Sequence, residues 1–421
     1  MNLALPAGRI PVRFSLPSLT IGGLQKVLLW AAMTSGFFVK IEPAPFDLMM
    51  IAVIILFLFT KSRITFAITP LIIFLLLYNL GGFISFLEIS SEFKATLFVV
   101  TSIYMSIMAI IVAIIISTDP MAYVPIMRNG WIVAATIASI MGIAGYFNIA
   151  GTGATLSIFG RAVGGFKDPN VFSTFLVGPA VFLVHGFLIG RQKWPLTSAA
   201  CLFVILGALF LAFSRGAWVS VMFASLLATV LTFALTNQGG LRVRIILLSV
   251  IGILAAIAAL ALLLSIPQVR ELFLDRFTLV KQYDAGETGR FGSQLNSIPI
   301  LLERPLGFGP TFFRRIFLND PHNVYLNAFA AYGWLGGVTY PLLIISSIVV
   351  GWRSIMTRTP FQHFALAVWC PMVATMFQGV QIDTDHWRHF YLLVGMNWGL
   401  YGATVFYKRD RYMAAQQWQQ T

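Results

Sequence analysis

The sequence predicts an all-helical protein that crosses a membrane many times. Of its 421 residues, 58% are hydrophobic and only 10% are charged, whereas soluble domains carry about 25% charged residues. The mean hydropathy is +0.85. The apolar residues gather in runs of roughly 20, the length that spans the hydrocarbon core of a bilayer as a helix. We therefore expect one polytopic membrane bundle rather than several soluble domains.

About twelve apolar runs are separated by charged residues or by proline and glycine, and each predicts a spanning helix. They lie at about 20–39, 43–60, 64–86, 95–117, 131–149, 171–190, 196–213, 217–236, 245–265, 324–351, 363–382 and 390–407. Lysine and arginine recur in every second short loop, and the positive-inside rule makes that side cytoplasmic. These residues are Lys61, Arg63, Arg128, Arg191, Lys193, Arg242, Arg244, Arg353, Arg358, Lys408, Arg409 and Arg411.

The same pattern gives the expected organisation along the chain. Residues 1–19 form a cytoplasmic tail, 20–265 carry nine spans, and 323–407 carry three more before a second cytoplasmic tail at 408–421. The long segment 266–322 between spans nine and ten lies on the outer side. Its mixed charges are typical of a solvated loop, because long loops translocate largely regardless of charge.

Four cations outside that long loop lie on the outer side, where the rule disfavours them. Arg215 is joined to two apolar runs only through Ser214 and Gly216, so its guanidinium lies at the membrane boundary. An interfacial anchor would explain it. The planar guanidinium presents several hydrogen-bond donors, and in a site with little water it also suits phosphate recognition. We predict that role for Arg215.

Arg161 and Lys167 lie in the outer loop Phe159–Phe172. Asp168 or Asn170 can cap the helix that follows, since Pro169 suits its first turn. The two cations flank flexible glycines. We expect them to form a second arm of an anion-binding site.

His322 is the candidate proton acceptor. Asp320 and Pro321 mark the start of the tenth span, so His322 lies in or just before its first turn, at the mouth of the bundle. An unperturbed imidazole pKa near 6.5 makes it a usable base at neutral pH. A capping or interfacial histidine is the alternative. Asn323 is expected to contact the substrate beside it.

Two neighbouring segments have simpler expectations. Residues 294–308 predict a short amphipathic helix broken by Pro305. Gly333, Gly336 and Gly337 are expected on one helix face, where they permit close approach of a neighbouring helix.

The outer loop Asp383–Phe390 gathers two carboxylates, two histidines, Arg388 and Trp387. The histidine spacing alone is weak support for a metal site. A role in binding the acceptor, or a structural role, is favoured, with Trp387 stacking on a sugar.

Three motifs occur in a characteristic order. They are "SRGAW", "GRFGSQLNSIPILLERPLGFGP" and "DPHNVYLNAFAAYGWLGG", in which "HN" is followed after nine residues by "GWLGG". This order resembles the superfamily of O-antigen ligases and O-antigen polymerases, over about residues 196–407.

The resemblance implies about twelve helices with a large periplasmic loop between the ninth and tenth, in the bacterial inner membrane. It implies inverting transfer of a glycan from undecaprenyl diphosphate to an acceptor hydroxyl on the periplasmic side, without a metal or other cofactor. His322 matches the family's histidine, the candidate base. Arg215 matches an arginine expected near the diphosphate, and Arg290 matches the arginine that opens the loop's amphipathic helix. The expected partners are this donor, a glycan or lipid A-core acceptor and membrane lipids, with no nucleic acid.

The acceptor stays open between two kinds of enzyme. Some ligases carry two adjacent histidines where this chain has Pro321, and "FKDPNVF" resembles polysaccharide polymerases, so a polymerase is favoured over a lipid A-core ligase. A transporter of the same lipid-linked glycan is a further alternative. Transporters usually place ionisable groups near the membrane midplane, whereas the candidates here crowd one face. A membrane scaffold without activity is the remaining alternative.

Overall fold

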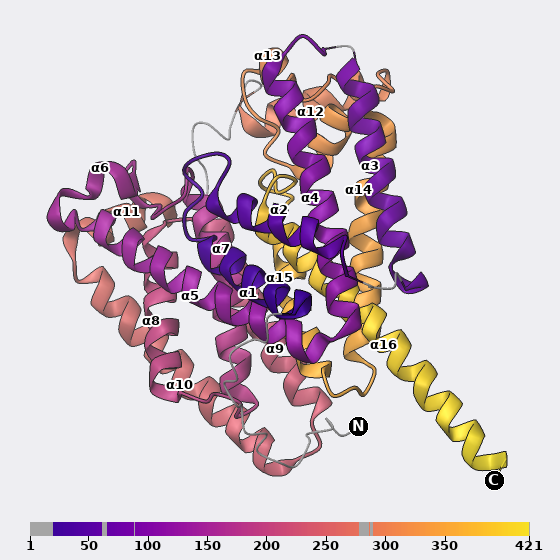
Figure 1. The fold of residues 1–421 in the computed structure, drawn as a ribbon. Coiled ribbons are helices and arrows are strands. Elements are labelled where there is room, and N and C mark those ends of the chain that lie inside the picture. Colours follow the sequence, from indigo (N-terminus) through magenta and orange to yellow (C-terminus); the bar gives the residue numbers. More distant parts are fainter. Residues whose placement is uncertain (1–19, 61–64, 88, 278–285, 287–288, 421) are drawn as a thin grey trace. The chain divides into compact units, whose positions relative to one another are not determined.

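A computed structural model describes residues 20–60, 65–87, 89–277, 286 and 289–420 (Figure 1). The predicted N-terminal tail, with Lys61, Arg63 and part of the long loop, lies outside the described residues. The described chain is almost entirely helical, apart from a hairpin of two short strands, β1 (Ser157–Ile158) and β2 (Arg161–Ala162). The all-helical prediction is confirmed.

Each predicted apolar run contains a helix. These are α1 (Ile21–Ser35), α2 (Pro45–Phe57), α3 (Thr69–Leu87), α4 (Phe93–Thr118), α5 (Pro120–Tyr146), α7 (Pro169–Leu188), α8 (Pro195–Leu211), α9 (Arg215–Leu235), α10 (Gly239–Leu264), α14 (Val324–Ile355), α15 (Gln362–Gln378) and α16 (Arg388–Gln420). Shorter helices are η1 (Phe66–Ile68), η2 (Ile149–Gly151), α6 (Gly153–Leu156), α11 (Pro267–Phe277), α12 (Arg290–Leu302) and α13 (Phe313–Phe317).

Seven helical segments of the described chain are long and apolar enough to cross a membrane. They are Phe66–Leu87, Phe93–Thr118, Pro120–Tyr146, Pro169–Leu188, Arg215–Leu235, Gly239–Leu264 and Val324–Ile355. Two shorter apolar helices, α2 and α8, fall below that length. The protein is therefore a helical protein with several candidate membrane spans.

The chain forms two compact units, each built from separate stretches of sequence. The first comprises Met1–Ser62, Asp119–Phe277 and Ile355–Ala374, and the second comprises Arg63–Thr118, Thr278–Ser354 and Thr375–Thr421. In the first unit, α1 packs on α2 and α5, and α7 packs on α8 and α9. Trp131 of α5 is fully buried there, and a side chain at Gly178 of α7 would come within 2.8 Å of its ring.

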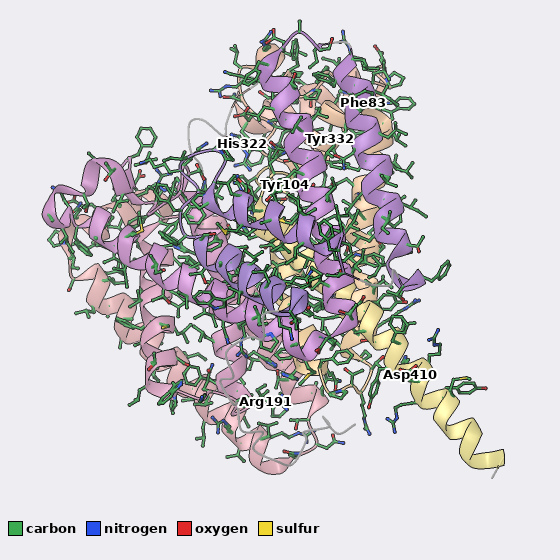
Figure 2. All side chains as sticks on the ribbon, viewed as in Figure 1. Phe83, Tyr104, Arg191, His322, Tyr332 and Asp410 are labelled. Atoms are coloured by element: carbon green, nitrogen blue, oxygen red, sulfur yellow. The ribbon has the colours of Figure 1, made fainter. Side chains whose placement is uncertain are left out.

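In the second unit, α16 packs closely along α4. Gly395 and Gly399 of α16 permit this, because a Cβ atom there would lie 2.6 and 2.7 Å from the backbone carbonyl oxygens of Ala109 and Ala113. Small residues at such positions let helices approach closely in a membrane. The helix continues beyond the predicted end of the last span at residue 407, and Asp410 lies on this extension (Figure 2).

Helix α14 is broken at Gly333, where φ is +64° and ψ is −169°. The segment after α12 fills the break. The Trp334 N–H donates to the Pro305 carbonyl at 2.8 Å, and the Phe308 N–H donates to the Ala330 carbonyl at 2.8 Å. The expectation that Gly333 lies on one helix face with Gly336 and Gly337 was wrong, since this glycine breaks the helix with a backbone conformation that L-residues avoid. The close approach occurs at Gly336, whose backbone N lies 2.8 Å from a Cβ built on Gly81 of α3.

Candidate functional site

His322 lies in a strained turn directly before α14. Its φ is +48°, in the left-handed region that residues other than glycine seldom occupy. The side chain is partly exposed. The Asn323 side chain caps the helix by accepting from the N–H groups of Tyr325 at 3.0 Å and Leu326 at 3.2 Å. The helix start was therefore placed correctly by the sequence, but Asn323 rather than Asp320 provides its cap.

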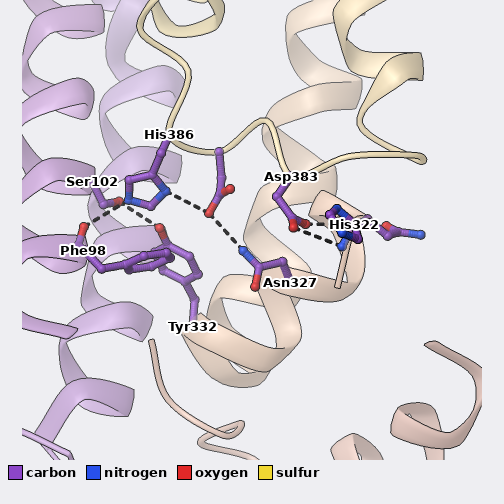
Figure 3. A network of polar contacts seen from close by, with 9 residues as sticks. Phe98, Ser102, His322, Asn327, Tyr332, Asp383 and His386 are labelled. Carbon is purple, nitrogen blue, oxygen red and sulfur yellow. Dashed lines mark hydrogen bonds and ion pairs between the residues drawn. The ribbon is translucent and has the colours of Figure 1, made fainter. Parts of the chain in front are cut away.

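Asp383 holds the backbone of this turn. One carboxylate oxygen accepts the His322 N–H at 3.0 Å, and the other accepts the Asn323 N–H at 3.0 Å. Figure 3 shows both contacts side by side. A two-point contact of this kind fixes both the position and the direction of the turn. The sequence favoured an acceptor-binding or structural role for the loop that contains Asp383, but it did not predict this contact, because Asp383 is 61 residues from His322 along the chain.

Helix α12 holds the other side of the same turn. The Arg290 guanidinium donates to the His322 carbonyl at 3.2 Å and also to the Gln381 carbonyl. The Gln294 amide donates to the Pro321 carbonyl at 2.7 Å. A helix is present where the amphipathic helix was predicted, and it begins at Arg290, but it ends at Leu302, three residues before Pro305. In this structure Arg290 positions the turn of His322, while its contact with a diphosphate stays a prediction.

The electrostatic state of Asp383 is unusual. Burial, with the neighbouring Asp385 carboxylate, raises the pKa of Asp383 to about 7, and the N–H donors of His322 and Asn323 work against that rise. A carboxyl group that titrates near neutrality next to a candidate base is typical of functional sites.

The remaining predicted residues of this loop are placed as follows. Trp387 is buried, with 6% of its surface exposed, and its ring centroid lies 5.3 Å from that of His389. Arg388 is the first residue of α16 and is partly exposed. Their contacts with an acceptor stay predictions.

In the first unit the structure brings Arg161 close to the start of α9. The Arg161 guanidinium donates to the Ala212 carbonyl at 2.7 Å and to the Asn170 side-chain oxygen at 2.9 Å. Ala212 directly follows α8 and lies three residues before Arg215, which is the first residue of α9 and is partly exposed. Two of the predicted cations thus share one end of this unit.

Lys167 has a different environment. Its ammonium forms a 2.7 Å ion pair with Glu42, and both side chains are about half exposed, at 51% and 49%. The predicted cap of α7 is confirmed, because the Asp168 carboxylate accepts from the N–H groups of Asn170 and Val171. A role for Lys167 toward an anion stays a prediction.

A comparison with known protein families guides the interpretation of this geometry. The family model described as O-antigen ligase matches residues 200–340. The matched region contains Arg215, Arg290 and the His322–Asn323 turn, and it ends after the break in α14. The family suggested by the ordered motifs is confirmed for this part of the chain. No curated protein matches the sequence significantly.

The matched region does not include the loop Asp383–Phe390, whose Asp383 binds the backbone of the His322 turn. Asp383 and its neighbours lie beyond residue 340, yet they bind the backbone at His322. His322 therefore depends on a contact from outside the matched region.

Proposed function

We propose that the protein is a bacterial inner-membrane glycosyltransferase. It transfers a glycan from undecaprenyl diphosphate to an acceptor hydroxyl on the periplasmic side, and we favour a polysaccharide polymerase. The observation that carries this proposal is the clamped turn of His322 within an O-antigen ligase domain. Strained backbone persists where the surrounding structure over-determines it, and it clusters at functional sites.

In the proposed reaction, the His322 imidazole takes the proton of the acceptor hydroxyl. The oxygen then attacks the anomeric carbon of the donor from the side opposite the phosphate. The bond between that carbon and the phosphate oxygen breaks, its electron pair stays with the undecaprenyl diphosphate, and the configuration at the carbon inverts. The clamp on His322 serves this step, since a base must be held within hydrogen-bond reach of the proton it accepts.

Arg215 is proposed to neutralise the charge that grows on the diphosphate as this bond breaks. Planar guanidinium groups suit that task because they bind phosphate oxygens in a bidentate manner. Arg161 binds the carbonyl of Ala212 and so supports the segment that carries Arg215. The reaction needs no metal or nucleotide sugar in this proposal.

The proposed topology has twelve spans, with both termini in the cytoplasm and residues 266–322 on the periplasmic side. Support comes from the helices found in all twelve apolar runs. The described part of the long loop contains α11, α12 and α13.

A polymerase is favoured over a lipid A-core ligase by the position before His322. Pro321 occupies it, is buried, and offers its carbonyl to Gln294. A second histidine of the kind found in some ligases is therefore replaced by a residue that packs against α12.

The test is transfer by purified protein in lipid nanodiscs, with a defined undecaprenyl-diphosphate-linked repeat unit as the only substrate. We expect chains of several repeats from the wild-type protein. His322→Ala should lower the rate by at least ~10²-fold, the usual contribution of a general base, and Arg215→Ala should also lower it. Asp410→Asn, on the exposed end of α16, is the matched control for expression and insertion.

Normal chain length and yield from both variants would refute the assignment. A wild-type protein that extends no repeat unit, but joins the glycan to lipid A-core, would replace the polymerase by a ligase. In a deletion strain, accumulation of single repeat units indicates a lost polymerase, whereas long unattached chains indicate a lost ligase.

A further inference from the structure

A partly buried histidine near Asp383 has oxygen atoms within hydrogen-bond distance of both of its ring nitrogens. The Nδ1 atom of His386 lies 3.1 Å from an Asp385 carboxylate oxygen, and its Nε2 atom lies 3.0 Å from the Phe98 carbonyl oxygen (Figure 3). The Phe98 ring covers the imidazole at a centroid distance of 4.0 Å. A carbonyl oxygen only accepts hydrogen bonds, so Nε2 must carry a hydrogen. An ionised Asp385 likewise requires a hydrogen on Nδ1.

The surroundings of His386 support a positive charge on it. The Asp385 side chain is 3% exposed and that of His386 is 23% exposed. Burial lowers the pKa of His386 and is the largest single effect, but the Asp385 carboxylate, the Phe98 carbonyl and Asp383 together outweigh it and leave that pKa raised. A buried carboxylate without a counter-ion would be costly.

Neighbouring elements contribute polar but uncharged groups around this pair. The Asp385 charge acts on the buried phenols of Tyr78 in α3, Tyr332 in α14 and Tyr391 in α16. None of these phenols carries a charge at neutral pH. Asp383 and Asp385 are thus the ionisable carboxyl groups that act on His386.

The pair connects three parts of the second unit. The same oxygen of Asp385 that meets His386 accepts the Asn327 side-chain N–H at 3.1 Å. Asn327 lies one turn after Asn323 in α14. The loop therefore binds the start of α14 at two points. Asp383 binds the turn of His322, and Asp385 binds Asn327. His386 ties the loop to α4 through the Phe98 carbonyl.

We propose that His386 is an imidazolium ion and that its ion pair with Asp385 is a positioning element, which fixes the Asp383 loop between α4 and α14. The hydrogen-bond geometry requires a hydrogen on Nε2 and one hydrogen between Nδ1 and Asp385, and the proposal places that second hydrogen on Nδ1. The consequence for His322 rests on the proposed function. Neither His386 nor Asp385 is expected to touch the reacting atoms. A polar pair of this kind selects one arrangement of the loop rather than adding much stability.

The competing arrangement has the same number of protons. A neutral His386 could accept on Nδ1 from a protonated Asp385 while donating from Nε2 to Phe98. Nitrogen NMR of the wild-type protein in nanodiscs, with ¹⁵N-labelled histidine, distinguishes the two. The chain has five histidines, and His386→Gln assigns the signal. At pH 7.5 we expect both ring nitrogens of His386 to carry hydrogens. One nitrogen without a hydrogen would overturn the proposal.

Asp385→Asn tests the positioning role. An asparagine keeps the size and one acceptor oxygen for Asn327, but it removes the negative charge. We expect His386 to become neutral at pH 7.5 and kcat to fall about 10-fold with little change in donor KM. On the alkaline side of the pH profile, the rate of Asp385→Asn should begin to fall at a lower pH than that of the wild-type protein. Asp410→Asn should leave the rate and its pH profile unchanged.

An Asp385→Asn variant with the wild-type rate and pH profile would refute the positioning role. A failure of the proposed function would be seen in the transfer assay and can be told apart from a failure of the ion-pair proposal. If the wild-type protein formed no glycosidic bond, the NMR signal of His386 would still decide its charge, and the proton-coupled nitrogens would still confirm or exclude the ion pair.

Discussion

At the scale of single residues, the site is a histidine held by its backbone. Asp383 binds two N–H groups of the turn, and Arg290 with Gln294 binds two carbonyl groups. None of these four contacts uses the imidazole of His322. The arrangement therefore fixes the backbone from which the imidazole projects.

Asp383→Asn should affect activity in a pH-dependent way. Because the pKa of Asp383 is about 7, the wild-type group is a full carboxylate only above neutrality. An asparagine has one acceptor oxygen, so one of the two N–H groups loses its partner, which costs about 1–3 kcal/mol when the group is buried. We expect the variant to be about 10-fold slower than wild type at pH 8 and closer to it at pH 6. A rate ratio independent of pH would contradict this.

The same titration predicts the opposite trend for stability. The folded-state pKa of Asp383 lies above its ordinary value of 3.8, so the folded protein binds more protons than the unfolded chain between about pH 4 and 7. Stability due to this group therefore falls as pH rises through that window and is constant above it. Thermal unfolding should show a steeper loss between pH 5 and 8 for wild type than for Asp383→Asn.

At the scale of elements, helices were predictable and their interruptions were not. Apolar runs of about 20 residues predicted every long helix, because burial in a bilayer demands both that length and that composition. The break in α14 depends on residues 305–308, which come from another part of the chain. Likewise, "DTDHWRHF" was recognisable as a polar loop, but only the fold shows that Asp383 meets His322. Long-range partners of this kind leave no periodic signal in a single sequence.

Gly333→Ala tests whether the break in α14 is required. Alanine would have to adopt a φ of +64°, and its Cβ would lie 2.6 Å from the Pro305 carbonyl oxygen. Backbone strain of this type costs about 1–3 kcal/mol, and the clash adds to it. We expect a lower thermal unfolding temperature in nanodiscs and a lower transfer rate. Gly252→Ala in α10 is the matched control, because nothing lies within 4 Å of a Cβ there. Equal unfolding temperatures for the two variants would show that the break is dispensable.

At the scale of the whole molecule, the distribution of charge is the main determinant of topology. The chain carries 28 lysines and arginines against 15 carboxylates, and most of the short basic loops fall on alternate connections. The exceptions include Arg215 and Arg161, and the Arg161 guanidinium binds the Ala212 carbonyl three residues before Arg215. In the proposed topology these cations lie on the side that insertion disfavours, and we propose an anionic ligand rather than anchoring as the reason.

Cysteine labelling can decide this orientation in intact cells. The described chain has two free cysteines, Cys201 and Cys370, and their replacement by serine gives a background without thiols. A single cysteine at Lys167 or Arg314, both exposed, should react with a membrane-impermeant maleimide once the outer membrane is permeabilised. A cysteine at Asp410 should react only after the inner membrane is opened, because the proposed topology places it in the cytoplasm. Labelling of positions 167 and 410 under the same condition would put the predicted anion-binding arginines and the C-terminus on one side, and the proposed twelve-span arrangement would have to be abandoned.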